Sequence, residues 1–131
     1  FKEFNDHYGH QQGDQVLIQV AASLADSVRR ASDLVYRYGG EEFCVLLSEV
    51  DRMTSVALAE QIRQRVHDLA IPHEVVPGGR LSISVGLCHS NELAVTTPEA
   101  MLSAADQALY QAKAQGRDRV VDAQGPAVAA A

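Results

Sequence analysis

Apolar residues recur at helical and strand spacing along most of the chain, separated by short polar segments. Over residues 15–30 they fall three and four positions apart, which predicts a helix with Asp14 as its N-cap. Two apolar runs at 34–38 and 43–47 predict strands joined by a hairpin turn. A second helix is expected over 54–69, where apolar positions form one stripe.

The C-terminal half continues the alternation of helix and strand. Residues 81–88 alternate between apolar and small polar side chains, as in a half-buried strand. Thr97 and Pro98 predict the N-cap and first residue of a third helix, which Gly116 would end in a left-handed conformation. A last strand is expected at 119–122. This order predicts a mixed α/β fold, with a central sheet covered by helices.

Length and composition fit one soluble domain. The 131 residues are 47% hydrophobic and 21% charged, with no apolar run that could span a membrane and no visible signal peptide. We assign the domain to residues 1–121 and expect 122–131 to be a disordered tail. Cys44 and Cys88 lie far apart and outside any C-x-x-C motif, which predicts buried thiols in a reducing, cytoplasmic compartment.

The charge balance excludes one class of partner. The net charge is −6, from 17 acidic and 11 basic residues, and neither half of the chain is basic. We therefore expect no general nucleic-acid binding. The lysines are scarce, since Lys2 and Lys113 are the only two.

The hairpin turn, Gly39-Gly40-Glu41-Glu42, is the first candidate for chemistry. Glycines let a backbone approach a ligand, and adjacent carboxylates gain from a cation between them. Mg²⁺ is usually held by one or two carboxylates together with substrate phosphates. A solvated turn with ordinary surface acids explains the same residues, because turns are normally polar.

Two further segments carry candidate binding groups. Lys113 and Arg117 lie at the end of the third helix, where they could clamp phosphate or simply complement the helix dipole. The N-terminal segment carries Asn5, Asp6 and Asp14, and an asparagine with an aspartate could together read the edge of a purine base. The same residues could belong to a polar loop before a helix, with Asp14 as its N-cap.

These segments together resemble the GGDEF family of diguanylate cyclases. The match runs from residue 1 to 121 and rests on three motifs in the order of the family, residues 1–14, 37–43 and 105–117, with Gly-Gly-Glu-Glu-Phe as a variant of the signature. The resemblance implies a fold similar to nucleotide-cyclase and polymerase palm domains. It also implies that two GTP are condensed into cyclic di-GMP and two pyrophosphates, with Mg²⁺ or Mn²⁺, at the interface of two domains.

The resemblance also implies roles for individual residues. Glu41 would hold the metal and help to deprotonate the 3′-hydroxyl, Glu42 would support the metal, and Lys2 would stabilise the transition state. Asn5 and Asp14 would read the guanine base, and Gly40 would let the backbone approach the ribose. Lys113 and Arg117 would bind the triphosphate, and Phe1 would belong to the phosphate-binding loop.

An inhibitory site for the product is implied at Arg30 and Asp33. The R-x-x-D pattern occurs three times, at 30–33, 65–68 and 119–122, but only the first has the family's spacing to the hairpin. Arg63 is a further candidate for this site. An ion pair at a helix end, which contributes little, explains the same pattern.

The chain departs from the family in two places. The family has a strand with an aspartate metal ligand immediately before Phe1, so we expect the printed sequence to lack one metal carboxylate and the central strand. Asp118 stands where the family usually has asparagine, and its carboxylate would weaken Arg117 if it pointed inward.

Two functions are consistent with these residues. The first is an active cyclase that catalyses the reaction as a homodimer. An upstream sensory or regulatory domain would control it, and the parent protein could be anchored in a membrane. The alternative is a non-catalytic module that senses cyclic di-GMP or GTP.

Overall fold

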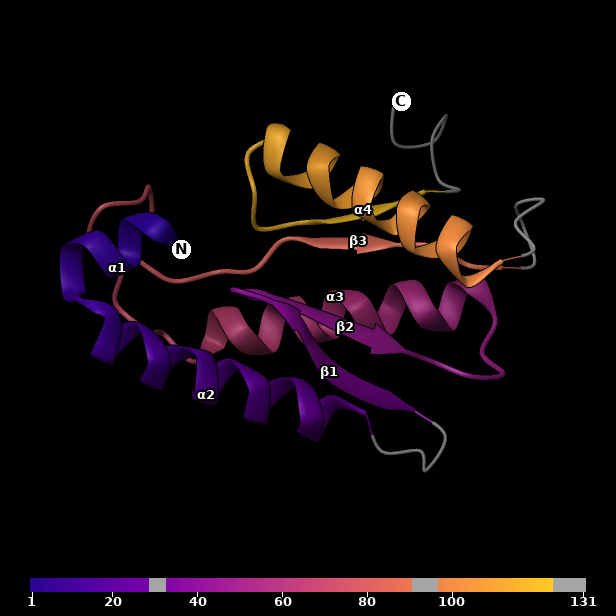
Figure 1. The fold of residues 1–131 in the computed structure, drawn as a ribbon, viewed down its shortest axis with the longest axis horizontal. Coiled ribbons are helices and arrows are strands. Elements are labelled where there is room, and N and C mark those ends of the chain that lie inside the picture. The colour runs from indigo at the N-terminus through magenta and orange to yellow at the C-terminus, as the bar shows by residue number, and fades with distance from the viewer. Residues whose placement is uncertain (29–32, 91–96, 124–131) are drawn as a thin grey trace. The chain divides into compact units, whose positions relative to one another are not determined.

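The computed structural model describes residues 1–28, 33–90 and 97–123 (Figure 1). By its internal contacts the chain divides into two compact units. Unit 1 comprises Phe1–Glu49 with Gln64–Leu81, and unit 2 comprises Val50–Arg63 with Ser82–Ala131. Most of the expected tail, from residue 124 onward, lies outside the described residues.

Unit 1 begins with two helices, α1 (Lys2–Tyr8) and α2 (His10–Ser27), separated by Gly9 at φ 91°. The predicted start of the long helix was wrong. Asp14 lies inside α2 and not at its N-cap, because the polar residues before it continue the helix back to Gly9. The helix also ends earlier than expected, since Val28 has extended backbone angles. Sequence periodicity detected the buried stripe of α2 but not its exposed first turn.

The predicted hairpin is confirmed. Strands β1 (Leu34–Gly39) and β2 (Glu42–Leu46) pair antiparallel, with Tyr36 opposite Cys44 and an irregularity in register between Arg37 and Gly39. Such an irregularity next to the turn increases the local twist of the two strands.

The remainder of unit 1 comes from the end of α3 (Arg52–Asp68) and the segment that follows it. Pro72 and Arg80 form an isolated bridge, and the Leu81 amide donates to the Ile71 carbonyl at 2.8 Å, so this segment folds back on itself. The buried apolar side chains of unit 1 are Phe4, Val16, Val20, Leu24, Val66 and Leu81.

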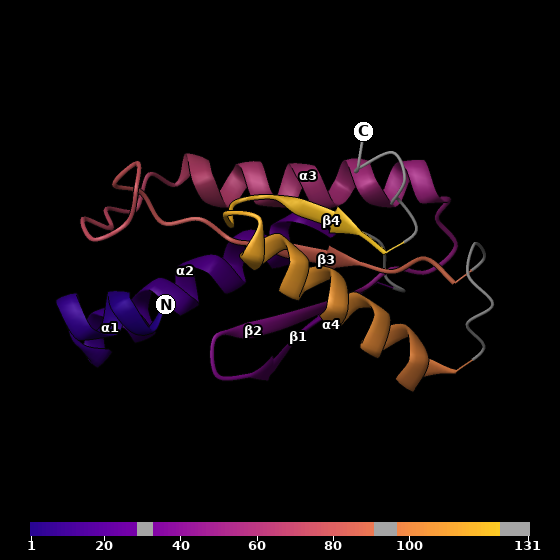
Figure 2. The same ribbon diagram turned by 90° about the horizontal axis from the view of Figure 1, so that it is seen from above.

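Unit 2 contains a parallel pair of strands, β3 (Val85–Leu87) and β4 (Val120–Asp122), with helix α4 (Pro98–Ala114) packed along both (Figure 2). Gly86 allows this packing, because a β-carbon there would overlap the backbone of Ala105 and Leu109. The predicted Thr97 cap is confirmed, since its hydroxyl accepts a 3.1 Å hydrogen bond from the Ala100 amide.

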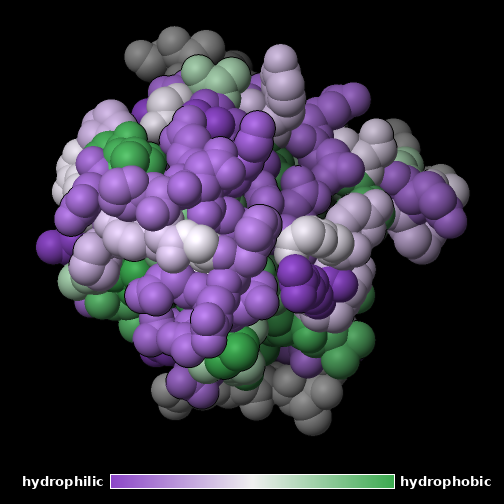
Figure 3. All heavy atoms as spheres, turned by 60° about the vertical axis from the view of Figure 1, so that its left-hand side comes forward, coloured by the Kyte–Doolittle hydropathy of each residue, from purple (hydrophilic) through white to green (hydrophobic). Residues whose placement is uncertain are grey.

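The mixed α/β class predicted from the sequence is confirmed, with one antiparallel and one parallel pair of strands. Cys44 and Cys88 form no disulfide with each other and are half-buried, so the expectation of buried thiols was only partly correct. None of the described helices has the length and apolar character needed to cross a membrane. Hydrophilic side chains cover most of the face shown in Figure 3, where apolar residues form only separate patches.

Candidate functional site

The hairpin turn presents both carboxylates at the end of a short, locally fixed loop. Gly40 has a left-handed φ of 54°, and its carbonyl accepts a 2.7 Å hydrogen bond from Nε of Arg37. Glu41 lies exposed in the turn, and Glu42 is the half-buried first residue of β2. Nothing lies within 4 Å of the place where a Gly40 β-carbon would be, so the space beside this backbone is open.

The two predicted base-reading residues lie on adjacent helices. Asn5 is on α1 and Asp14 is on α2. The Asn5 side-chain oxygen is buried, has no hydrogen-bond partner among the described atoms, and lies directly against Gly13. A buried acceptor without a partner is costly, so this oxygen is available to a donor that reaches it.

A groove of about 580 Å³ connects the Asp14 end of α2 to the hairpin. Asp14 and Leu17 line it from the helix, whereas Arg37 and Phe43 line it from the strands on either side of the turn. The structure therefore places a predicted base reader in one groove with Arg37 and Phe43, which flank the carboxylate-bearing turn. Its walls combine apolar side chains with a few polar groups, which is typical of a small-molecule site.

A cluster of aromatic rings supports α1. Phe1 stacks on Phe4 with ring centroids 5.6 Å apart, and Phe4 meets the edge of His73 at 5.1 Å. The Tyr8 hydroxyl accepts a 3.0 Å hydrogen bond from the Glu74 amide. Because α1 carries Lys2 and Asn5, this cluster fixes the backbone position of two predicted site residues. The sequence reasoning had given neither His73 nor Glu74 a role.

Burial determines the state of His73. Its side chain is 5% exposed and its Nδ1 has no hydrogen-bond partner among the described atoms. Loss of solvation lowers the pKa of His73 below its usual value near 6.5. The neutral imidazole is therefore the form that packs under α1.

The predicted phosphate-binding residues share one turn in unit 2. Lys113 is in the last turn of α4, and Arg117 follows Gly116, whose φ is 121°. The Arg117 amide donates to the Ala112 carbonyl at 2.9 Å, and the Gly116 amide donates to the Lys113 carbonyl at 3.4 Å. This is the hydrogen-bond pattern of a Schellman motif, and it confirms the predicted left-handed glycine.

A divalent metal fits the hairpin turn only if phosphates or water complete its coordination shell. Within the described residues, no three His, Cys, Asp or Glu side chains come together to hold an ion. Glu41 and Glu42 supply two neighbouring carboxylates, which suits Mg²⁺ because it commonly takes one or two protein carboxylates and completes its shell with phosphates and water.

The predicted inhibitory site is only partly described. Asp33 accepts a 3.2 Å hydrogen bond from the Ser48 amide, whereas Arg30 lies outside the described residues.

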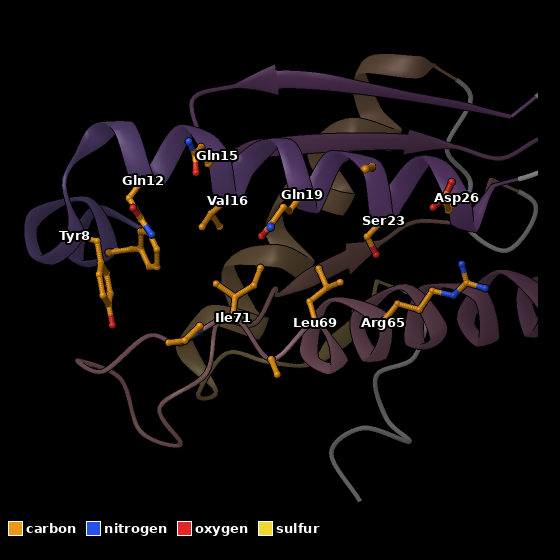
Figure 4. Close-up of a pocket in the computed structure, with 14 residues that line it drawn as sticks. Tyr8, Gln12, Gln15, Val16, Gln19, Ser23, Asp26, Arg65, Leu69 and Ile71 are labelled. Carbon is orange, nitrogen blue, oxygen red and sulfur yellow. The ribbon is translucent and has the colours of Figure 1, made fainter.

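A larger hollow, of about 740 Å³, lies elsewhere in unit 1. Figure 4 shows Val16, Gln19 and Ser23 of α2 facing Leu69 and Ile71 across it. No residue that the sequence analysis proposed for substrate, metal or product lines this hollow. We therefore take the smaller groove beside the hairpin as the candidate site.

Comparison with known proteins identifies the family. The family model described as diguanylate cyclase, GGDEF domain, matches residues 1–119. Diguanylate cyclase DosC of Escherichia coli is 40% identical over 120 residues, covering 92% of this chain and 25% of DosC. Response regulator PleD of Caulobacter vibrioides is 43% identical over 124 residues, covering 92% of this chain and 26% of PleD. The chain thus spans about a quarter of the length of these relatives.

A solved structure gives the same result for the fold. The GGDEF domain of DgcB from Caulobacter crescentus, in complex with c-di-GMP, superposes with a TM-score of 0.81 at 30% identity. The match covers 94% of this chain and 71% of the DgcB chain.

Proposed function

The chain belongs to the GGDEF family of diguanylate cyclase domains, and we propose that it condenses two molecules of GTP into cyclic di-GMP with release of two pyrophosphates. The proposal includes a single catalytic domain, residues 1–121, that is active as a homodimer. Each protomer holds one GTP, and the two sites face each other during the reaction.

The single observation that carries the proposal is the geometry of the hairpin turn. Arg37 holds the Gly40 carbonyl, and the left-handed glycine leaves open space beside two consecutive carboxylates. A purely structural turn does not require two acids there. Catalysis does, because one carboxylate can accept a proton while both hold positive charge near the phosphates.

Recognition of guanine is assigned to Asn5 and Asp14. The Asp14 carboxylate can accept hydrogen bonds from the ring and exocyclic N–H groups of guanine, whereas the Asn5 amide can accept or donate. Leu17 and Phe43 provide apolar walls to the groove beside Asp14. We propose that the base lies against these walls.

The triphosphate is assigned to a small set of cations. Lys113 and Arg117 would bind its oxygens, Lys2 would stabilise charge that develops in the transition state, and the backbone at Phe1 would approach the phosphates. The chain carries a net charge of −6, so binding of a polyanion depends on such local groups and not on the overall field.

The chemistry is phosphoryl transfer. The 3′-hydroxyl oxygen of each GTP attacks the α-phosphorus of the other, and Glu41 takes up the hydroxyl proton in its own protomer. Each new P–O bond replaces the bond to pyrophosphate, so two bonds form and two break per product. Mg²⁺ or Mn²⁺ bound by Glu41 and Glu42 would neutralise phosphate charge and lower the pKa of the hydroxyl.

Regulation is part of the proposal. We assign product inhibition to Arg30 and Asp33, because an arginine fork can grip phosphate and stack on a base. An upstream regulatory domain is supported by the likeness to PleD, which is named a response regulator. The absence of a disulfide between Cys44 and Cys88 fits a reducing, cytoplasmic location.

The test uses the native full-length protein with GTP and Mg²⁺. We expect cyclic di-GMP to form with a specific activity that rises with protein concentration, because two protomers are needed. Glu41→Gln should abolish formation, whereas Glu99→Gln, which changes an exposed acid in the first turn of α4, should leave it unchanged. Binding of GTP without any product would support the non-catalytic sensing module instead.

A further inference from the structure

Arg63 of α3 is held in unit 2 by two carboxylates. Its Nη1 donates to Oδ1 of Asp118 at 2.7 Å, and its Nε donates to Oε1 of Glu60 at 2.8 Å. The Arg63 side chain is only 15% exposed. The hydrogen bonds to Glu60 and Asp118 raise the pKa of this guanidinium above its usual value, against the opposing effect of burial. The group is therefore a fixed cation.

The segment that Arg63 contacts is conformationally demanding. After Gly116, both Arg117 and Asp118 have left-handed backbone angles, with φ of 64° and 48°. Residues with a β-carbon resist this region, although aspartate tolerates it better than most. Two such residues in succession require contacts that hold them.

Three contacts hold this turn. The Arg117 amide is bonded to the end of α4, and the Arg117 carbonyl accepts a 3.0 Å hydrogen bond from Nε of Arg119. The bond from Arg63 to Asp118 is the only one of the three that comes from a distant part of the sequence. It ties the turn to another helix of the same unit.

The contact also determines where the Asp118 charge is directed. A carboxylate next to Arg117 could pair with its guanidinium or repel an incoming phosphate. Instead the Asp118 carboxylate is bonded to Arg63. Among the described residues, the Arg117 guanidinium has no hydrogen-bond or ion-pair partner, so it is available to an anion.

We propose that Arg63 is a positioning residue for Arg117: its ion pair with Asp118 holds the left-handed turn and keeps the Asp118 carboxylate away from the phosphate-binding guanidinium. The inference rests on the proposed function, because it concerns the triphosphate of the bound nucleotide. It also explains how the chain accommodates an aspartate at position 118.

The experiment measures the affinity of the native full-length protein for Mg²⁺-GTP by calorimetry. We expect Arg63→Gln to weaken binding about fivefold, the scale of one uncompensated, partly exposed charge. Arg63→Lys keeps the charge and should weaken binding less. Adding Asp118→Asn to Arg63→Gln should restore most of the affinity, because the interfering carboxylate is then gone.

Arg52→Gln provides the matched control. It breaks the ion pair between Arg52 and Asp122, 2.8 Å long and in the same unit, without touching the turn. We expect its affinity for Mg²⁺-GTP to equal that of the wild type even if its melting temperature falls as far as that of Arg63→Gln.

The outcomes separate the two proposals. Equal loss of affinity in Arg52→Gln and Arg63→Gln, or no recovery in the double variant, overturns the role of Arg63. Wild-type protein that binds Mg²⁺-GTP but forms no product overturns the proposed reaction alone. Wild-type protein that does not bind Mg²⁺-GTP overturns both.

Discussion

The side-chain oxygen of Asn5 lies directly against Gly13, where α2 passes α1. A β-carbon at position 13 would overlap this oxygen, so the glycine determines where the amide can lie. The oxygen is buried and has no hydrogen-bond partner among the described atoms. Gly13 thus determines the position of the Asn5 amide, which is the predicted guanine reader.

Gly13→Ala should separate binding from stability. Alanine is favoured over glycine within a helix by up to about 1 kcal/mol, which offsets part of the cost of displacing the Asn5 side chain, so the protein should still fold. The new methyl group should displace the Asn5 amide and raise KM for GTP about tenfold, the effect of one or two lost hydrogen bonds. Steady-state kinetics together with thermal unfolding will test this. Gln11→Ala, an exposed neighbour, should change neither; an unchanged KM in Gly13→Ala would contradict the proposed role of Asn5.

Arg37→Ala should affect turnover more than folding. The exposed hydrogen bond from Arg37 to the Gly40 carbonyl contributes about 1 kcal/mol or less to stability. Without it the turn is free to shift Glu41, and misplacement of a catalytic group commonly costs ten- to a hundredfold in kcat. Arg80→Ala, which removes another exposed arginine of unit 1, should leave kcat unchanged. Equal kcat values for the two variants would show that Arg37 does not hold the turn.

The two glycines of the turn should respond differently to alanine. Gly40 has a φ of 54°, whereas Gly39 has no left-handed angle, and open space surrounds the β-carbon position of both. Gly40→Ala should therefore destabilise the protein by about 1–2 kcal/mol through backbone strain alone. Gly39→Ala should cost less than half of that. Chemical unfolding of the two variants measures the difference, and equal costs would contradict the backbone geometry of the turn.

Stability should fall as the pH drops below about 6.5. The pKa of His73 is lowered by burial, so the unfolded chain takes up a proton on this residue at a higher pH than the folded chain does. The stabilisation is complete above pH 6.5 and is lost as pH falls toward the folded pKa. Glu3 and His7 face His73 with opposite effects on this pKa.

His73→Phe should flatten this pH dependence, because it keeps an aromatic ring against Phe4 but cannot take up a proton. His10→Gln, which removes an exposed histidine, should retain the wild-type slope. Melting temperatures between pH 5 and 8 provide the comparison. A wild-type slope in His73→Phe would assign the titration to another group.

The sequence correctly predicted the elements that have both a clear hydrophobic period and a turn or cap residue at one end. The hairpin, α4 with its Thr97 cap, and the glycine at 116 were all predicted correctly. Hydrophobic periodicity cannot detect a helical segment in which fewer than two apolar side chains are buried. α1 buries only Phe4, and in the first turn of α2 only Gly13, which has no side chain, is buried, so neither shows a repeated apolar pattern. That is why both were missed, and why Asp14 was wrongly assigned as an N-cap.

The candidate site likewise contains residues that could be predicted from the sequence and residues that could not. Motif residues could be predicted because each carries a functional group needed for the chemistry. Their supports could not, since Arg37, His73 and Arg63 act through partners that only the fold brings near. Two of these had a usable signal: Arg37 lies within the hairpin motif, and the partner of Arg63, Asp118, is a charged departure from the family pattern.

The proposed reaction is tested most directly by counting its products. Native full-length protein and its Glu41→Gln variant should be incubated with GTP and Mg²⁺, and cyclic di-GMP and pyrophosphate quantified in the same samples. The wild type should release two pyrophosphates for each cyclic di-GMP, and Glu41→Gln should release neither while still binding GTP. Pyrophosphate without cyclic di-GMP, or full turnover by Glu41→Gln, would contradict the account.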